Sequence, residues 1–387
     1  MSRSTEAIIK PGLLVWARKS AGMTLEDAAR RLKMSSDGLN GWEKGEVKPT
    51  TKQLRKAAQV YKQSFAVFYL DEVPEAFIPP VRDYRHLPEV GQSKLSPELF
   101  LDIRLALNHR EQFLDLLEQQ NISPVGFSKE TSLVKDAERV GQGIREWLNI
   151  NFERQREWRD TRIGFNVWRE TIESKGVIVR QTKQIPLSEM RGYSLAQFPF
   201  PIIVLNRKDA YAGRAFSLIH ETVHLMLRAS GLCDLEIRGD ASSKDVRVEA
   251  FCNSVAGATL VPKEQFLTSI LVRKQKGEIW ENTTLVSLGK EFSVSREVIL
   301  GRALSFGLTT KEFYEGKLAE FRREYERLPK AEGFVPPHTD VVSLSGKPFV
   351  RLVLNSFFSD RITASDVSNY LGIKLKHFEK IKHAVEV

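Results

Sequence analysis

The sequence predicts a mainly helical α+β protein: an N-terminal helical bundle, a core that holds a small antiparallel β-sheet, and a helical C-terminal region. Three observations lead to this fold class. The 387 residues amount to two or three domains of ordinary size. Apolar residues recur at helical spacing through most of the chain. Short runs with the composition of strands are few, and they lie at residues 176–179, 192–195 and 202–205.

Composition excludes several classes of protein. Hydrophobic residues make up 42% and charged residues 28%, so the chain can bury sizeable cores and is not disordered overall. Two cysteines, Cys233 and Cys252, are too few for a disulfide framework, and we expect both to be reduced and buried. Glu6 precedes the first apolar run, which is atypical of a secretory signal, and no run reaches the ~20 apolar residues of a membrane span. These features predict a cytoplasmic protein without a membrane partner.

Positive charge is concentrated at the N-terminus. The whole chain has a net charge of +9, and residues 1–70 hold thirteen Lys and Arg against six Asp and Glu, a net +7. Four short helices are predicted in this segment from helical spacing and terminus signals. The residues that begin or end them are Pro11, Thr24, Ser35 or Ser36, Gly45 and Pro49. Short helices joined by tight turns, in a basic segment, are typical of a helix-turn-helix that reads DNA.

Residues 11–70 resemble the phage-repressor (XRE) family of helix-turn-helix domains, through TLEDAARRLKMSSDGLNGWEKGEVKP. The resemblance implies that the third helix faces the bases of double-stranded operator DNA, and that the protein is a homodimer on paired half-sites. The implied contacts are Ser36, Asp37, Asn40 and Lys44 toward the bases, and Lys48 and Lys52 toward phosphates. Asp37 is the departure, because an anion near DNA usually lowers affinity. The alternative is a small helical module that binds protein.

The remainder divides into three parts. Residues 71–95 contain four prolines and no apolar periodicity, so they read as a linker. Residues 96–330 form the predicted core domain, which begins with helices near 99–117, 134–148 and 165–172. Residues 331–387 form a helical C-terminal region whose role, sensing a signal or restraining the core, the sequence leaves open.

The chemistry is carried by His220, Glu221 and His224, in the segment AFSLIHETVHLML. Residues four apart share one face of a helix, so the two imidazoles can bind one zinc ion, while Glu221 reaches a water in the open position. The flanking residues are apolar, and a buried pair of imidazoles with a carboxylate needs compensation. The alternative is a core helix whose two histidines are satisfied without a metal.

A third ligand is required. The form in which a third histidine follows six residues after the second is excluded, because Leu227 and Ser230 stand where Gly and His are needed. Glu249, in the helix predicted from Val246, is the best third ligand. The other carboxylates considered are Asp245, Asp240 and Glu236, and the alternative for Glu249 itself is a solvated helix charge. Asn253, one helical turn beyond Glu249, is a predicted partner of a ligand.

The segments PFPIIVLNRKDAYAGRAFSLIHETVHLML and EAFCNSVAGATLVP resemble the ImmA/IrrE family of zinc metallo-endopeptidases, over roughly residues 177–328. The resemblance implies a gluzincin-like core in which His220, His224 and Glu249 hold Zn²⁺ and Glu221 is the general base. It also implies a protein substrate, a regulatory protein such as a repressor, cleaved in a stress response or in control of a mobile element. HETVH replaces the frequent HELGH, a change that leaves every ligand in place.

The sequence therefore predicts a DNA-binding transcription regulator with a zinc-dependent endopeptidase domain. The alternative is a DNA-binding repressor or antitoxin-like protein whose zinc domain is structural or sensory. Two further segments, SVSREVILGRALSFGLTT at 293–310 and ITASDVSNYLGIKLKHFEKI at 362–381, resemble pieces of helix-turn-helix or winged-helix domains. Short helices with a central glycine also form ordinary helical packing, which is the favoured interpretation of both segments.

Overall fold

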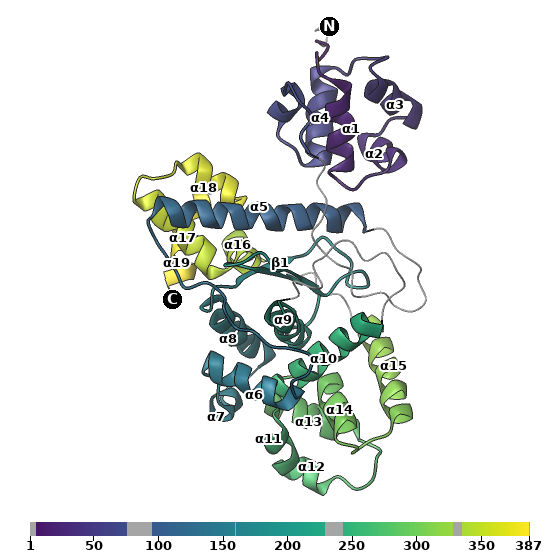
Figure 1. Ribbon diagram of the computed structural model, residues 1–387, viewed down its shortest axis with the longest axis vertical. Coiled ribbons are helices and arrows are strands. Elements are labelled where there is room, and N and C mark those ends of the chain that lie inside the picture. The colour runs from purple at the N-terminus through teal and green to yellow at the C-terminus, as the bar shows by residue number, and fades with distance from the viewer. Residues whose placement is uncertain (1–4, 76–94, 159, 229–242, 328–334, 387) are drawn as a thin grey trace. The chain divides into compact units, whose positions relative to one another are not determined.

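The computed structural model describes residues 5–75, 95–158, 160–228, 243–327 and 335–386 (Figure 1). This chain is mainly helical with one three-stranded sheet, which confirms the predicted fold class. It divides into two compact units, the first ending within helix α5 at residue 107 and the second beginning at residue 108. Most of the predicted linker lies outside the described residues.

The first unit contains the predicted four helices. Their bounds, with those of the turn and the helix that follow, are α1 Pro11–Lys19, α2 Leu25–Leu32, α3 Ser36–Lys44, α4 Thr51–Tyr61, the 3-10 helix η1 Phe65–Tyr69 and α5 Pro97–Gln119. Thr24, Ser35 and Thr50 each cap a helix by accepting a backbone N–H, so the third helix begins after Ser35. Gly45 ends that helix in the left-handed region, at φ 78°.

Two arginines, Arg104 buried and Arg18 half-buried, fix the first unit around its apolar core. Arg18 of α1 forms a two-pronged ion pair with Glu43 of α3, with N···O distances of 2.7 and 2.8 Å. Arg104 of α5 donates to the carbonyls of Ser20, Tyr61 and Lys62, at the C-terminal ends of α1 and α4. These carbonyls have no partner within their helices, so Arg104 satisfies groups that would otherwise be buried without one.

The second unit surrounds a small sheet. Its strands are β1 Ile178–Thr182, β2 Gly192–Leu195 and β3 Ile202–Asn206. Its remaining helices are α6 Ala137–Leu148, α7 Phe152–Arg156, α8 Thr161–Glu173, α9 Tyr211–Met226, α10 Ser243–Leu260, α11 Lys263–Thr268, α12 Ile270–Lys274, α13 Asn282–Phe292, α14 Arg296–Ser305, α15 Lys311–Arg327, α16 Pro337–Ser345, α17 Lys347–Phe358, α18 Ala364–Leu371, η2 Leu375–His377 and α19 Phe378–Glu386.

The sheet is mixed, and the expectation of a wholly antiparallel sheet is wrong for one pair. The strand order is β1-β3-β2, with β2 antiparallel and β1 parallel to β3. Every residue of β3 is buried, so this strand takes the centre, where apolar side chains are covered on both faces. β2 is therefore an edge strand that forms a hairpin with β3, and β1 occupies the other side.

Helix α9 packs against β2 and β3 and also contacts α8 and α10, as Figure 1 shows in teal and green. One continuous apolar core joins these elements, and the buried Cys252 belongs to it, as predicted, whereas Cys233 lies outside the described residues. Among the described helices, none combines the length and apolar character required to cross a bilayer.

Candidate metal centre and nucleic-acid interface

Helix α9 brings the two predicted histidines together. It is apolar on nearly every side, and His220 and Glu221 are only 6% and 5% exposed. The Nε2 atoms of His220 and His224 lie 3.0 Å apart, on the same face of the helix. Two ring nitrogens this close together can bind the same ion, as the spacing of four residues between the histidines predicts.

Glu249 of α10 completes the cluster. Its Oε2 lies 3.3 Å from Nε2 of His220, and its Oε1 lies 3.1 Å from Nε2 of His224. The three ligand atoms all lie within 4.8 Å of one another, and within the described part of the chain no other group of His, Cys, Asp and Glu meets this condition. The structure thus brings together the three residues that the sequence predicts as metal ligands.

Three buried side chains hold the C-terminal end of α10, and with it Glu249. Arg145 of α6 donates to the carbonyl of Thr259, and Gln155 of α7 donates to that of Leu260. Arg302 of α14 donates to the carbonyl of Val261, just beyond the helix. These carbonyls lie at a helix end, where partners within the helix are lacking. Elements distant in the sequence therefore anchor the end of α10, the helix that carries Glu249.

Hydrogen bonds set the orientation of the ligands. Nδ1 of His220 lies 3.0 Å from Oδ1 of Asn253, so Nδ1 carries the proton and Nε2 presents its lone pair to the cluster. Asn253 thus occupies the predicted place beside a ligand. Burial tends to raise the pKa of Glu249, but the two histidines outweigh it when they carry protons, through hydrogen bonds and charge, and they lower the pKa to about 2. The carboxylate is therefore ionised at neutral pH.

Glu221 is held by a residue that the sequence analysis did not identify. Oγ of Ser194, in strand β2, donates to Oε2 of Glu221 at 2.9 Å. Side chains alternate along a strand, so Gly192 and Ser194 face α9 while Tyr193 points to the other side of the sheet. A Cβ on Gly192 would lie 3.6 Å from Cγ of Glu221, so the strand passes close to the carboxylate. In the sequence, the segment GYSL places a glycine and a serine on the same face of a strand, and this pattern was the signal that could have identified the contact with Glu221.

The donor set suits a zinc ion. Two imidazole nitrogens and one carboxylate form the ligand set of many catalytic zinc sites, which leave a further position open for water. The near approach of two histidine nitrogens and a carboxylate is stabilised when a cation lies between them. Of the other carboxylates considered as ligands, Asp240 and Glu236 lie outside the described residues, as does the side chain of Asp245.

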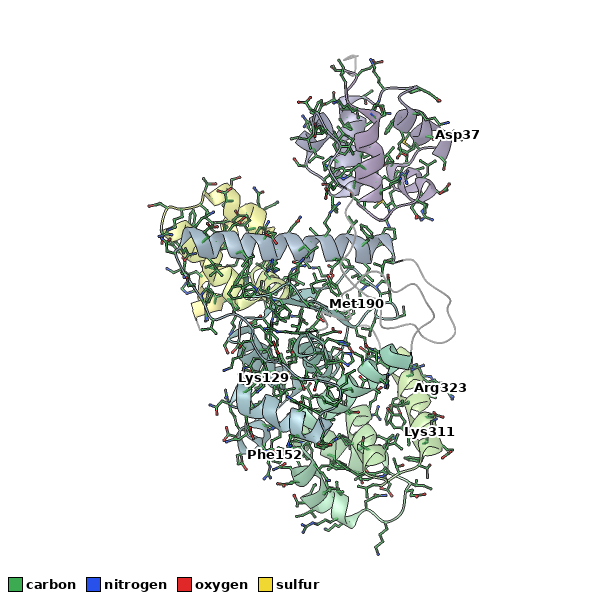
Figure 2. All side chains as sticks on the ribbon, in the orientation of Figure 1. Asp37, Lys129, Phe152, Met190, Lys311 and Arg323 are labelled. Carbon is green, nitrogen blue, oxygen red and sulfur yellow. The ribbon has the colours of Figure 1, made fainter. Side chains whose placement is uncertain are left out.

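The predicted DNA contacts lie on or after helix α3. Asp37, Asn40 and Lys44 follow at intervals of three and four residues and share one outward face, and Figure 2 labels Asp37 at the surface of its unit. Ser36 is half-buried at the start of the helix. Lys48 and Lys52, in the following turn and at the start of α4, are exposed. All six positions are thus accessible at least in part.

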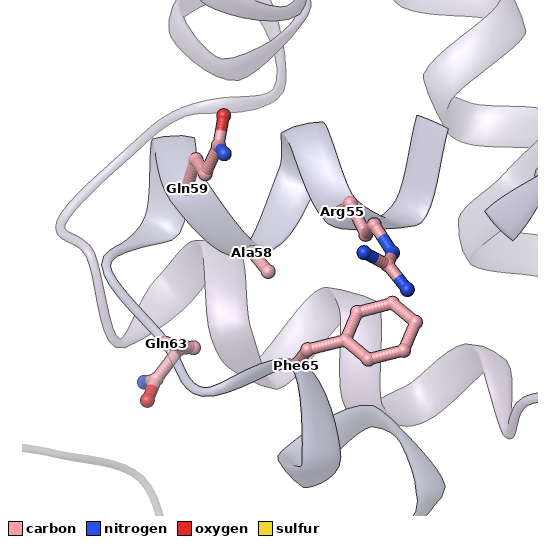
Figure 3. Close-up of a pocket in the computed structure, with 5 residues that line it drawn as sticks. All are labelled: Arg55, Ala58, Gln59, Gln63 and Phe65. Atoms are coloured by element: carbon pink, nitrogen blue, oxygen red, sulfur yellow. The ribbon is translucent and has the colours of Figure 1, made fainter. Parts of the chain in front are cut away.

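A small hollow lies in the same unit, between α4 and η1 (Figure 3). The guanidinium carbon of Arg55 lies 5.1 Å from the centre of the Phe65 ring, and Ala58, Gln59 and Gln63 complete the lining. The contact between a cation and an aromatic face stabilises the packing of η1 on α4. The lining holds no acid, base or nucleophile beyond this arginine, so we assign it a structural role.

Comparison with known families agrees with both assignments. Residues 14–68 match the helix-turn-helix family model. Residues 174–304 match the model of the IrrE N-terminal-like domain, peptidase family M78. This second match covers the sheet and helices α9 and α10, which carry the cluster of His220, His224 and Glu249. A search of curated proteins gave no match to the chain.

Proposed function

Since the chain joins an XRE-type helix-turn-helix domain to an IrrE N-terminal-like domain of the M78 peptidase family, we propose that it is a DNA-binding transcription regulator that also cleaves a protein. In this function the protein binds a zinc ion, hydrolyses peptide bonds and acts on a regulatory protein. It binds paired half-sites of DNA as a homodimer, through the predicted contacts on and after α3.

One observation carries the enzymatic part: the carboxylate of Glu221 is buried beside the cluster of His220, His224 and Glu249, and Ser194 holds it there. A zinc ion that only stabilised the fold would need its three ligands but not a second, fixed carboxylate beside them. A general base, by contrast, must stand within reach of the water that it deprotonates.

The proposed reaction is hydrolysis of a peptide bond. A zinc ion bound by His220, His224 and Glu249 would polarise the scissile carbonyl and the attacking water. Glu221 accepts the proton of that water as its oxygen attacks the carbonyl carbon, and then transfers this proton to the leaving nitrogen. Ser194 holds one oxygen of Glu221 by a hydrogen bond, which orients the carboxylate toward its proposed role as the base.

The substrate proposed is a regulatory protein, such as a repressor. A single chain with a DNA-reading helix and a peptidase site can couple transcription to removal of a regulator. The distribution of charge supports DNA binding by the N-terminal segment and a protein substrate for the peptidase site. Residues 1–70 carry +7 of the net +9, so the peptidase region has little excess charge with which to attract nucleic acid.

The test compares cells that express the wild-type protein with cells that express Glu221→Gln. New protein N-termini, enriched and identified by mass spectrometry, should appear with the wild type and be absent with Glu221→Gln. Glu312→Gln, at an exposed position of α15, is the matched control and should behave as wild type. Identical sets of N-termini in all three cell populations would favour a zinc domain that is structural or sensory.

A further inference from the structure

Three helices near the C-terminus repeat the spacing of the three that begin the DNA-binding domain. Helix α1 ends at Lys19 and Thr24 caps α2, while α17 ends at Phe358 and Thr363 caps α18, an interval of five residues in both cases. Helices α2 and α18 each have eight residues. The two segments therefore correspond position by position, at a constant separation along the chain.

The turns that follow α2 and α18 are also alike. Each begins with a residue in the left-handed region, Lys33 at φ 57° and Gly372 at φ 64°. In both, the next amide donates to a carbonyl five residues earlier: Met34 N to Ala29 O at 3.1 Å, and Ile373 N to the corresponding carbonyl, that of residue 368, at 3.2 Å. One extended residue then follows in each segment: Ser35 leads directly into α3, whereas Lys374 leads into the 3-10 turn η2, which takes the place of the first turn of α3 and runs on into α19. This is the turn of a helix-turn-helix.

The inner faces correspond as well. Leu371, at the end of α18, and Ile381, in α19, are buried, as are Leu32 and Trp42 at the matching positions of α2 and α3. Phe378, which matches the buried Leu39, packs its ring edge-on against Phe357 of α17, at 5.7 Å between ring centres. The apolar contacts that orient the second helix are thus present in both segments.

The outer face of α19 is exposed and basic. The positions of Asp37, Asn40 and Lys44 in α3 are taken by Lys376, Glu379 and His383, all exposed, and Lys380 lies on the same face. Residues 372–383 contain four lysines and one glutamate. Desolvation and then the neighbouring lysines lower the pKa of His377, which is the response expected in a locally positive field.

Helices α13 and α14 provide an internal comparison. Their turn has the same form: Ser293 is left-handed at φ 55°, and the amide of Val294 donates to a carbonyl five residues earlier, at 2.9 Å. However, Leu300, at the position of Asn40, is fully buried, and Arg296 is paired with Glu324 of α15. The reading face of α14 is therefore partly covered by protein, although Glu297 at the position of Asp37 is exposed, whereas the matching positions of α19 and the turn before it are all exposed.

We propose that α18 and α19 form a second DNA-binding helix-turn-helix, in which α19 lies along double-stranded DNA and Lys376 and Lys380 contact phosphates. The site is separate from the metal centre and from α3, and it extends the proposed function. Lysines favour contacts with the backbone over base recognition, and Glu379 limits affinity, so binding at α19 is tolerant of sequence.

The experiment measures binding of the full-length protein to a fluorescein-labelled duplex of 30 base pairs and mixed sequence, by anisotropy, over a series of salt concentrations. The test variant is Lys376→Glu with Lys380→Glu. The matched control, Lys135→Glu with Lys276→Glu, makes the same change of charge at two exposed lysines of the same unit. Circular dichroism confirms that each variant is folded.

The proposal predicts that the test variant lowers affinity by about tenfold or more and reduces the slope of log K against log salt by about 2, since each lost phosphate contact removes roughly 0.9. The control should bind as wild type does. Equal binding by the test and control variants would overturn the proposal, as would a clear preference of the wild-type α19 site for single-stranded RNA over the duplex.

A parallel variant, Lys48→Glu with Lys52→Glu, separates this proposal from the assignment of the N-terminal domain. Loss of duplex binding in this variant alone, with the α19 variant unaffected, would leave the first domain as the only DNA-binding site. A photoreactive residue at position 379 that cross-links to the duplex would support the proposal directly. The same residue at position 312 of α15 should give no cross-link.

Discussion

Asn253 and Ser194 each control one side chain of helix α9 through a single hydrogen bond. Asn253 accepts from Nδ1 of His220, and Ser194 donates to the carboxylate of Glu221. The first contact selects the tautomer that can bind a cation, and the second orients the proposed base. The two residues should therefore affect different measurable quantities.

Replacing Asn253 should weaken metal binding. Asn253→Ala leaves His220 free to rotate and to protonate on the other nitrogen, so we expect zinc affinity to fall by about 10- to 100-fold. Competition with a fluorescent chelator measures this change. Ser254→Ala, at the neighbouring exposed position of α10, should retain wild-type affinity. Unchanged affinity in Asn253→Ala would remove this residue from the metal centre.

Replacing Ser194 should slow cleavage and leave zinc content intact. A hydrogen bond to a charged group contributes about 1.5–3 kcal/mol, so Ser194→Ala should lower kcat by roughly 10-fold or more with little change in KM. The rate is measured on the substrate found with Glu221→Gln, and the pH profile of kcat should shift with it. Ser194→Thr keeps the hydroxyl and should recover much of the rate. Loss of zinc in Ser194→Ala would indicate a structural role instead.

At the level of residues, the sequence predicted what local spacing determines. His220 and His224 follow from the periodicity of one helix, and Asn253 follows from its place one turn beyond Glu249. Ser194 lies on strand β2, and its contact with Glu221, which is distant in the sequence, depends on how α9 packs across β2. A contact of this kind needs the tertiary structure.

At the level of elements, the position of Glu249 depends on the packing of α10 against α6. Gly141 of α6 lies where an added Cβ would be 2.8 Å from Cβ of Ala258 and 2.9 Å from the backbone nitrogen of Thr259. Glycine is therefore required for the two helices to approach. Gly143, two residues further along α6, has nothing within 4 Å of an added Cβ.

This pair of glycines gives a prediction with its own control. Gly141→Ala should lower the free energy of unfolding of the second unit by about 1–3 kcal/mol, because the helices must separate. Gly143→Ala should raise it by about 0.5–1 kcal/mol, because alanine favours the helical backbone. Urea unfolding followed by circular dichroism measures both. If the two substitutions had equal effects, the close contact of α6 and α10 would be refuted.

Helix starts and stops were also predictable, because caps are local signals. Thr24 and Gly45 stand where the sequence placed them. The orientation of β1 was not predictable in the same way. The runs of residues for β1 and β3 were correct in outline, but nothing local distinguishes parallel from antiparallel pairing when a third strand, β2, intervenes in the chain.

At the level of the whole molecule, positive charge is concentrated in the segment that carries the first helix-turn-helix. Residues 1–70 carry +7 of the net +9, and a protein that binds DNA through lysines and arginines releases counterions when it does so. Binding through α3 and the following turn should therefore weaken steeply as salt increases.

Single substitutions should resolve this salt dependence into individual contacts. Lys48→Gln and Lys52→Gln should each reduce the slope of log K against log salt by about 0.9. Lys135→Gln, at an exposed position of the second unit, should leave the slope unchanged. The duplex anisotropy measurement serves here as well. Slopes that match the wild type in both N-terminal variants would exclude these lysines as phosphate contacts.

The central claim is that His220, His224 and Glu249 form a zinc site served by Glu221. Elemental analysis of purified protein by mass spectrometry tests it most directly. We expect about one zinc per chain in the wild type and in Glu221→Gln, and almost none in His220→Ala. A wild-type protein that takes up no metal from a zinc-containing medium, or a His220→Ala variant that keeps its zinc, would contradict the claim.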